Sequence, residues 1–209
     1  HNEDEIRRKD IRIGDTVLVQ RAGDVIPEVV KSVPAQRSGM ETIFQMTNTC
    51  PSCGTAVVRM EGEALTRCVN AACPAQVKER IKHFASKGAF DIDGLGDKLV
   101  EHLINAGMVS RFGDLFRLDR DRLAAMERMG PKSADNLLAA LEESKTVDFA
   151  AFLYALGIRY VGEHVARLLA GHYDDVRQLA AADISELSQI DGVGPVVAQS
   201  LQSFFANPQ

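Results

Sequence analysis

Four cysteines are the residues of this chain whose spacing is best suited to binding a metal ion. Cys50 and Cys53 are separated by two residues, and Cys68 and Cys73 follow after a gap of 14 residues. A two-residue spacer lets two thiolates reach one ion, and the second pair completes a closed tetrahedral shell for zinc. Disulfide bonds are the alternative, but no signal-peptide pattern opens the chain, so we expect a reducing, cytoplasmic setting. We therefore predict a structural zinc site, because four thiolates leave no open position for catalysis.

A glycine turn recurs four times in the second half of the chain. The turns are spaced by 34, 32 and 32 residues and comprise Gly94-Leu95-Gly96, Arg128-Met129-Gly130, Tyr160-Val161-Gly162 and Gly192-Val193-Gly194. Each precedes a stretch of helical character, which predicts a tandem array of four helix-hairpin-helix units, here called hairpins one to four. A helix that begins at a glycine turn presents unpaired N–H groups and the positive end of its dipole. Such a terminus can bind a phosphate group without a charged side chain.

The turns differ in their first residue, because Arg128 and Tyr160 replace the first glycine in hairpins two and three. We expect φ to stay negative at both positions and their amides to be less well placed for DNA. Hairpin three is the one most suited to a purely structural role, with Tyr160 packed between helices; a DNA contact there stays the alternative. The candidate DNA contacts of the array are Gly94, Leu95, Gly96, Lys98, Gly130, Lys132, Ser133, Gly162, His164, Gly192 and Gly194.

The distribution of charge constrains how the array could bind DNA. The chain has a net charge of −5, which divides into −1 for residues 1–49, +3 for residues 50–90 and −7 for residues 91–209. A basic surface is the usual feature of a DNA-binding protein, and the array does not have one. It would have to bind phosphates through backbone amides, with local help from Lys98, Lys132 and His164. We expect such binding to be modest and to weaken steeply with salt.

The remaining patterns predict a multidomain α+β chain. Strand character over residues 15–21, 28–33 and 43–46 indicates most of a small β-barrel, and residues 56–59 and 64–68 form a predicted hairpin between the cysteine pairs. A helix with an apolar stripe is predicted over residues 74–84, and residues 76–209 should be all-helical. His83, His102 and His172 are expected to be ordinary helix residues. No apolar run is long enough to cross a membrane.

Several segments resemble the bacterial NAD-dependent DNA ligases. Ile13-Gly14-Asp15 and Arg21-Ala22-Gly23-Asp24-Val25-Ile26-Pro27 are similar to the oligonucleotide-binding (OB) domain of that family, which continues with a four-cysteine zinc finger and four helix-hairpin-helix motifs. Further matching segments are Cys50–Gly54, Cys73–Gln76, Asp91–Gly96, Met129–Ala134 and Phe152–Arg159. The resemblance implies a partial OB-fold over residues 1–48, a zinc finger over 49–75 and the helix-hairpin-helix array over 76–209. Arg21 and Gly23 become candidate DNA contacts beside a nick.

The resemblance also implies what this chain does not do. The nucleotidyl transfer of the family starts from the lysine of a Lys-x-Asp-Gly motif, and the nearest match, Asp91-Ile92-Asp93-Gly94, has an aspartate in its place. The chain begins without a methionine and is expected to be a non-catalytic C-terminal portion, inactive alone. NAD, magnesium, the adenylation domain and the BRCT domain of the same protein would lie outside it. The implied function is sequence-independent binding of duplex DNA, which clamps nicked DNA for sealing in replication and repair.

Two other classes of function stay open at this point. A scaffold for protein–protein interaction would suit the acidic array, and it predicts no nucleic-acid binding at any salt concentration. Another DNA repair or junction-binding protein could use tandem hairpins, but it would not need the segment over residues 21–27.

Overall fold

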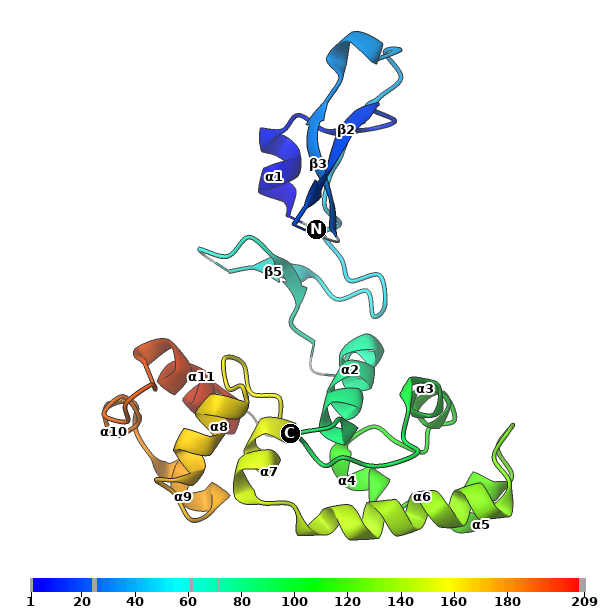
Figure 1. Ribbon diagram of the computed structural model, residues 1–209, viewed down its shortest axis with the longest axis vertical. Coiled ribbons are helices and arrows are strands. Elements are labelled where there is room, and N and C mark those ends of the chain that lie inside the picture. The colour runs from blue at the N-terminus through cyan, green and yellow to red at the C-terminus, as the bar shows by residue number, and fades with distance from the viewer. Residues whose placement is uncertain (1, 24–25, 61, 71, 207–209) are drawn as a thin grey trace. The chain divides into compact units, whose positions relative to one another are not determined.

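The computed structural model describes residues 2–23, 26–60, 62–70 and 72–206. The chain divides into two compact units, His1–Cys73 and Pro74–Gln209, which are described separately (Figure 1). Both the strand-rich segment and the cysteine segment lie in the first unit, and the boundary expected between residues 48 and 49 stays a prediction. Within the described part of the chain, no helix has both the length and the apolar character needed to span a bilayer.

The first unit consists of short elements. They are α1 (Glu3–Arg8), β1 (Arg12–Ile13), β2 (Val17–Ala22), β3 (Ile26–Ser32), the 3₁₀ turn Pro34–Gln36, β4 (Thr42–Ile43), β5 (Val57–Arg59) and β6 (Thr66–Cys68). The strands pair antiparallel as β1 with β4, β2 with β3 and β5 with β6. The predicted strands are therefore present, but among the described residues each ladder has only two strands and no closed barrel forms. Asp24 and Val25 lie outside the described residues.

Polar contacts hold the strand-rich part of this unit together. The Arg37 guanidinium donates from Nε to Asp15 at 2.7 Å and from Nη1 to Asp10 at 2.8 Å. The hydrogen bond from Arg37 is the main reason that the pKa of Asp15 falls to about 2. Large apolar side chains here are mostly exposed, among them Ile13, Leu18, Val19, Ile26, Met40 and Ile43.

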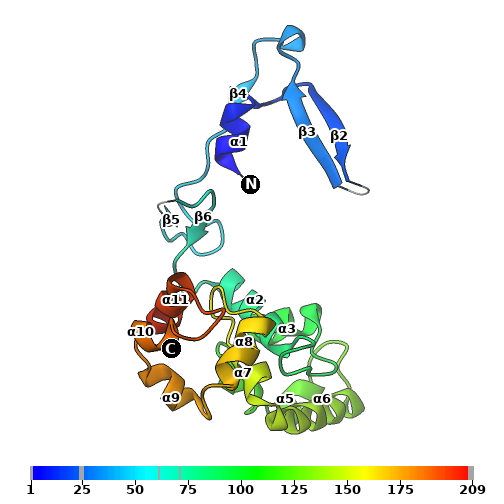
Figure 2. The same cartoon turned by 60° about the vertical axis from the view of Figure 1, so that its left-hand side comes forward.

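The second unit is helical, and its two halves are distinguishable in both views as α2–α6 in green and α7–α11 in yellow to red (Figures 1 and 2). Its helices are α2 (Pro74–Ala85), α3 (Asp97–Asn105), α4 (Phe112–Leu115), α5 (Arg120–Ala124), α6 (Pro131–Glu143), α7 (Phe149–Ala155), α8 (Glu163–Ala170), α9 (Val176–Ala181), α10 (Ile184–Leu187) and α11 (Pro195–Phe205), with a 3₁₀ turn at Ser144–Thr146. The helix predicted over residues 74–84 is α2, and its apolar stripe is buried at Ile81 and Phe84.

Four pairs of consecutive helices pack against each other: α2 with α3, α5 with α6, α7 with α8 and α10 with α11. Each pair encloses one of the glycine turns, so the structure has the four hairpins that the repeat predicted. The buried side chains form two clusters. Core one includes Ile81, Val100, Leu103, Leu115, Leu123 and Leu137, and core two includes Leu153, Leu169, Leu179, Leu187, Val193 and Leu201. Hairpins one and two therefore share core one, and hairpins three and four share core two.

His83 joins the two halves of the helical unit. Its ring nitrogen Nε2 lies 2.7 Å from the carbonyl oxygen of Tyr154 in α7, and the two rings meet edge-on with centroids 4.6 Å apart. A Cβ added to Gly157 would come within 3.4 Å of the His83 ring, and Gly157 has a φ of +65°. His83 and His102 lie in α2 and α3, as predicted for ordinary helix residues, whereas His172 lies in the turn after α8 and not in a helix. The repeat pattern contains no information on which residue packs between the two halves.

Candidate metal centre and nucleic-acid interface

The four cysteines converge on one point in the first unit. Their Sγ atoms all lie within 4.8 Å of one another, with Cys50 and Cys73 at 3.9 Å and Cys53 and Cys68 at 3.6 Å. All four are free thiols, which argues against the disulfide alternative. In a tetrahedral site with Zn–S bonds of about 2.3 Å, neighbouring sulfurs lie about 3.8 Å apart. The sulfur separations therefore fit a four-thiolate zinc ion.

Local backbone structure positions the first cysteine pair. The loop after Cys50 is closed by hydrogen bonds from the Gly54 N–H to the Cys50 carbonyl and from the Cys50 N–H to the Thr55 carbonyl, both 2.8 Å. Gly54 has a φ of +71°, a conformation that favours glycine. The second pair is brought close by the β5–β6 hairpin, in which Val57 lies opposite Cys68. Cys73 is 1% exposed and Cys50 is 8% exposed, so the centre is closed on one side.

The environment of the thiols differs between the two pairs. Hydrogen bonds from the side chain and backbone of Thr55 lower the pKa of Cys53 to about 6. At Cys68 a backbone hydrogen bond from Asn70 lowers the pKa. Burial and the adjacent Cys53 and Cys50 have the opposite effect and together outweigh it, so the pKa of Cys68 is raised to about 11. Four thiolates this close repel one another, and a divalent cation offsets that repulsion. When bound, the ion supplies a structural crosslink.

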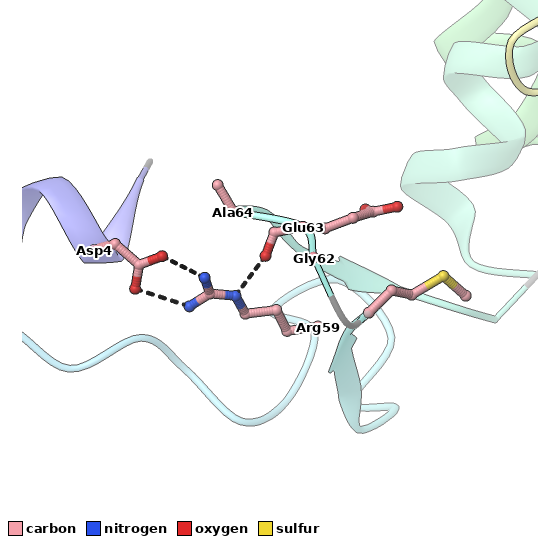
Figure 3. Close-up of a pocket in the computed structure, with 6 residues that line it drawn as sticks. Asp4, Arg59, Gly62, Glu63 and Ala64 are labelled. Carbon is pink, nitrogen blue, oxygen red and sulfur yellow. Dashed lines mark hydrogen bonds and ion pairs between the residues drawn. The ribbon is translucent and has the colours of Figure 1, made fainter.

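Arg59 connects the zinc segment to the start of the chain (Figure 3). Its guanidinium donates to both carboxylate oxygens of Asp4 in α1 and, at 2.6 Å, to the carbonyl oxygen of Glu63 in the turn between β5 and β6. A hollow of about 490 Å³ lies beside these groups. Its charged side chains already bond to one another, so they hold the segment in place and do not indicate a ligand.

The four helices that follow the turns, α3, α6, α8 and α11, share an unusual start. Each begins after a glycine in the extended conformation: Gly96, Gly130, Gly162 and Gly194. In the part of the chain that the structure describes, none of these N-termini receives a side-chain cap. All four glycines are exposed, and a Cβ added to any of them would meet nothing within 4 Å. Their φ values are negative, so neither the backbone conformation nor a neighbouring atom requires glycine there.

Four other helices of the same unit begin differently. In α5, α7, α9 and α10 an aspartate side chain caps the helix, from Asp119, Asp148, Asp175 and Asp183 respectively. Aspartate is the usual way to bind the first N–H groups of a helix. An aspartate in the same place would also repel an approaching anion. The helices that follow the four turns therefore differ from their neighbours in a way that suits an external anion.

The turns before these helices have one common geometry. The middle residue donates its N–H to the carbonyl three residues earlier, as Leu95 does to Ile92 and Val193 does to Ile190. The first residue of each turn has a positive φ: +78° at Gly94, +64° at Arg128, +65° at Tyr160 and +86° at Gly192. The prediction of a negative φ at Arg128 and Tyr160 was therefore wrong, because the hydrogen bond and the apolar packing of the turn impose the same backbone on all four.

The structure separates the predicted contacts of the array by exposure. Lys98, Lys132 and His164 are exposed, and each is the second residue of its helix, beside the uncapped N-terminus. Ser133 and the six turn glycines are exposed as well. Leu95 is only 6% exposed, and its N–H is already bonded within the turn. The Leu95 side chain therefore helps to hold the turn in place, and a contact of Leu95 with DNA stays a prediction.

Tyr160 does not pack between helices, as one reading of the sequence expected. It is 49% exposed, and the Arg159 guanidinium carbon lies 4.6 Å from the centroid of its ring. The repeat alone singles out Arg128 and Tyr160, because these two residues occupy the position that Gly94 and Gly192 hold in the other two turns.

Hairpins one and two face a common depression of about 430 Å³. Its lining includes Gly94 and Lys98 from hairpin one and Arg128 and Ser133 from hairpin two.

The negative charges of the acidic residues at the start of α3 and α8 are offset by ion pairs within the helical unit. Asp97 lies 2.9 Å from Lys82, and Glu163 lies 3.5 Å from Arg167. The hydrogen bond to Asp97, and then that to Glu79, raises the pKa of Lys82.

In the first unit, Arg21 and Gly23 lie near the tip of the β2–β3 hairpin. Both residues are exposed, Arg21 lies opposite Pro27, and Gly23 has a φ of +62°. Residues Asp24 and Val25 of the tip are outside the described residues. Exposure at a hairpin tip is compatible with a contact to an external molecule.

The chain thus combines four helix-hairpin-helix units with a cluster of four cysteines that could hold a metal ion. Four family models match the chain: the NAD-dependent DNA ligase OB-fold domain over residues 1–41, the NAD-dependent DNA ligase C4 zinc finger domain over residues 49–75, a SAM-like helix-hairpin-helix tandem over residues 89–143, and a helix-hairpin-helix motif over residues 151–209. The chain belongs to the NAD-dependent DNA ligase family.

Similar proteins agree with this assignment. The chain is 62% identical over 210 residues to a DNA ligase of Desulfosudis oleivorans, 55% identical over 209 residues to one of Methylococcus capsulatus and 49% identical over 211 residues to one of Symbiobacterium thermophilum. Each match covers 100% of this chain and 31% of the relative. The chain thus spans about a third of the length of the curated relatives that it matches.

Proposed function

We propose that this segment binds duplex DNA without reading its sequence and helps a ligase to enclose nicked DNA while the strand is sealed. The observation that carries the proposal is that α3, α6, α8 and α11 each begin after an exposed glycine and receive no side-chain cap. Because nothing within the described protein occupies the space beside them, the glycines suit the close approach of an external group to the backbone.

Phosphate is the group that best fits these helix starts. Unpaired N–H groups and the positive end of the dipole favour an anion, and the second residues Lys98, Lys132 and His164 add basic side chains at three of the four sites. Contacts to phosphates position a protein on DNA but carry no sequence information. A ligase has to act at nicks of any sequence, so binding through the backbone suits this task.

The zinc centre has a structural role in this proposal. Cys50, Cys53, Cys68 and Cys73 would fill all four positions of the ion, which leaves none for a substrate. Arg21 and Gly23 would contact DNA near the nick. The nucleotidyl transfer from NAD, assisted by magnesium, belongs to the whole ligase, and we expect no sealing by this chain alone, because it lacks the Lys-x-Asp-Gly motif. The adenylation and BRCT domains, the cytoplasmic location and the role in replication and repair are part of the same proposal.

The test is binding of this chain to nicked duplex DNA over a series of salt concentrations. We expect affinity to fall linearly with salt on logarithmic axes and to depend little on sequence. The variant Gly96→Val with Gly194→Val should bind at least about tenfold more weakly, a loss of about 1.4 kcal/mol, with unchanged helix content. The added side chains would stand between the helix N–H groups and the phosphate.

Gly113→Val is the matched control, because Gly113 in α4 also has open space around its Cβ position but lies outside the turns. Its affinity should equal that of the unsubstituted chain. Equal affinity in the Gly96/Gly194 variant would refute the role of the amides. An absence of binding even at low salt would refute DNA binding and favour a protein-interaction scaffold.

A further inference from the structure

Two bulky residues of the helical unit adopt a backbone conformation that their side chains disfavour. Among the described residues, the non-glycine residues with a positive φ are Asp10, Asp91, Arg128 and Tyr160. Aspartate tolerates this left-handed region, whereas a bulky residue there is strained. Arg128 and Tyr160 are the two that occupy hairpin turns.

The fold itself gains little from these two side chains. The Arg128 side chain is 80% exposed, and its ion pair with Glu127, at 3.5 Å, is equally open to solvent. Exposed pairs of this kind contribute little to stability. Tyr160 is 49% exposed, and its ring contact is with its sequence neighbour Arg159. Glycine would relieve the strain at both positions, as it does at Gly94 and Gly192.

The four turns allow a direct comparison of the same position. At Gly192 an added Cβ would lie 2.8 Å from Cδ1 of Leu168, so the leucine side chain would have to shift. At Gly94 nothing lies within 4 Å, so space alone does not require glycine there. Hairpins two and three therefore carry large, substantially exposed side chains at a position where the backbone prefers glycine.

We propose that Arg128 and Tyr160 contact the sugar–phosphate backbone of DNA through their side chains, so that hairpins two and three bind it by side chain as well as by amide. This inference rests on the proposed DNA-binding function. Arg128 lies two residues before the uncapped Gly130 and lines the same depression as Lys98 and Ser133, so its guanidinium is placed to bind a phosphate. Tyr160 lies two residues before Gly162, and its ring, stacked with Arg159, offers an apolar face to a deoxyribose.

The experiment measures both stability and DNA affinity in Arg128→Gly and Tyr160→Gly, using the 209-residue chain and nicked duplex DNA. A residue that served only the fold would destabilise the chain when removed. We expect the opposite: an equal or higher midpoint of thermal unfolding, with binding weakened about three- to tenfold. Arg128→Gly should also reduce the slope of log affinity against log salt by about one, whereas Tyr160→Gly should leave that slope unchanged.

Two further variants serve as controls. Tyr160→Phe keeps the ring and should bind like the unsubstituted chain, since the proposed contact uses the ring face. Arg117→Ala removes an exposed arginine of the same unit outside the turns and should leave the salt slope unchanged. Unchanged affinity in either glycine variant overturns the assignment of that residue, and so does a lowered unfolding midpoint. If the unsubstituted chain does not bind DNA at any salt concentration, this inference and the proposed function both fail, whereas binding that is insensitive to the two variants refutes this inference alone.

Discussion

The two units of this chain are stabilised by different interactions. In residues 74–209, two clusters of aliphatic and aromatic side chains are buried, and Tyr160 and Val196 are the large apolar residues of the described part that stay exposed. In the described part of residues 1–73, the buried residues are Ser32, Cys50 and Cys73, while apolar side chains along the strands face solvent. Ion pairs such as Arg37 with Asp15, and the cysteine cluster, take the place of an apolar core there.

This difference shows how each unit presents its functional groups. The helical unit can leave four helix N-termini uncapped because its apolar cores supply the stability that the caps would have added. The first unit has no such reserve, so its geometry depends on a few polar contacts and on the cluster of four cysteines. Changes in these links should therefore act locally and strongly, and changes in the helical cores should act on whole hairpin pairs.

The largest expected effect is the loss of the metal. Cys68→Ser should release zinc and unfold residues 49–75, because structural zinc contributes on the order of 10 kcal/mol to the folding of small metal-binding domains. Helix content from residues 74–209 should persist. Metal content by mass spectrometry and hydrogen exchange of the two units are the measurements. Ser52→Ala, in the loop between Cys50 and Cys53, is the control that should keep the metal. Full zinc content in Cys68→Ser would contradict the site.

A smaller effect is expected from a cavity in either helical core. Leu103 in core one and Leu169 in core two are both fully buried. Each change to alanine should lower the free energy of unfolding by about 2–5 kcal/mol. Urea denaturation measures the loss, and hydrogen exchange shows whether it is confined to one hairpin pair. Val196→Ala, at an exposed position, should change stability by less than about 0.5 kcal/mol. Equal loss of protection in both pairs after one substitution would mean that the two cores unfold as one.

The link between the two halves of the helical unit should contribute less than either core. His83→Phe keeps a ring in contact with Tyr154 but removes the hydrogen bond to the Tyr154 carbonyl oxygen. We expect a loss of about 0.5–1.5 kcal/mol in the free energy of unfolding, because one hydrogen bond is removed while the Tyr154 carbonyl oxygen keeps the one from the Gly157 N–H. Urea denaturation with probes in each half would measure it. An unchanged free energy of unfolding would contradict a stabilising role for the hydrogen bond between His83 and the Tyr154 carbonyl oxygen.

The smallest effect should be a pH dependence confined to the first unit. The pKa of Asp15 is lowered to about 2, mainly by its hydrogen bond from Arg37. The stability that this pair contributes should be complete above about pH 4, the range of an unfolded aspartate, and should disappear as the pH falls to about 2. Asp15→Asn should remove this dependence, and an NMR titration of the Asp15 carboxyl should give the pKa directly. An ordinary pKa near 4 would contradict the pairing.

Much of this structure could be predicted from local patterns. The spacing of Cys50, Cys53, Cys68 and Cys73 was enough to predict a four-thiol cluster, because short spacers limit how such side chains can be arranged. The glycine repeat predicted the four hairpins, because each turn is a local structure with its own hydrogen bond. The packing between hairpins was harder to predict from the sequence. The role of His83 between α2 and α7, and the burial of Leu95, depend on which elements meet in space.

The amino-acid sequence by itself determined the cluster of four cysteines, the repeat and the family resemblance, since these depend on residue types and short spacings. Only the tertiary structure decided the conformation of the turns. Arg128 and Tyr160 were expected to avoid a positive φ on the basis of their own side chains. Their turns adopt it because the bond from the middle N–H and the buried apolar residue of the turn fix the backbone. A residue's own preference is worth about 1–2 kcal/mol, and the packing of a whole hairpin outweighs it.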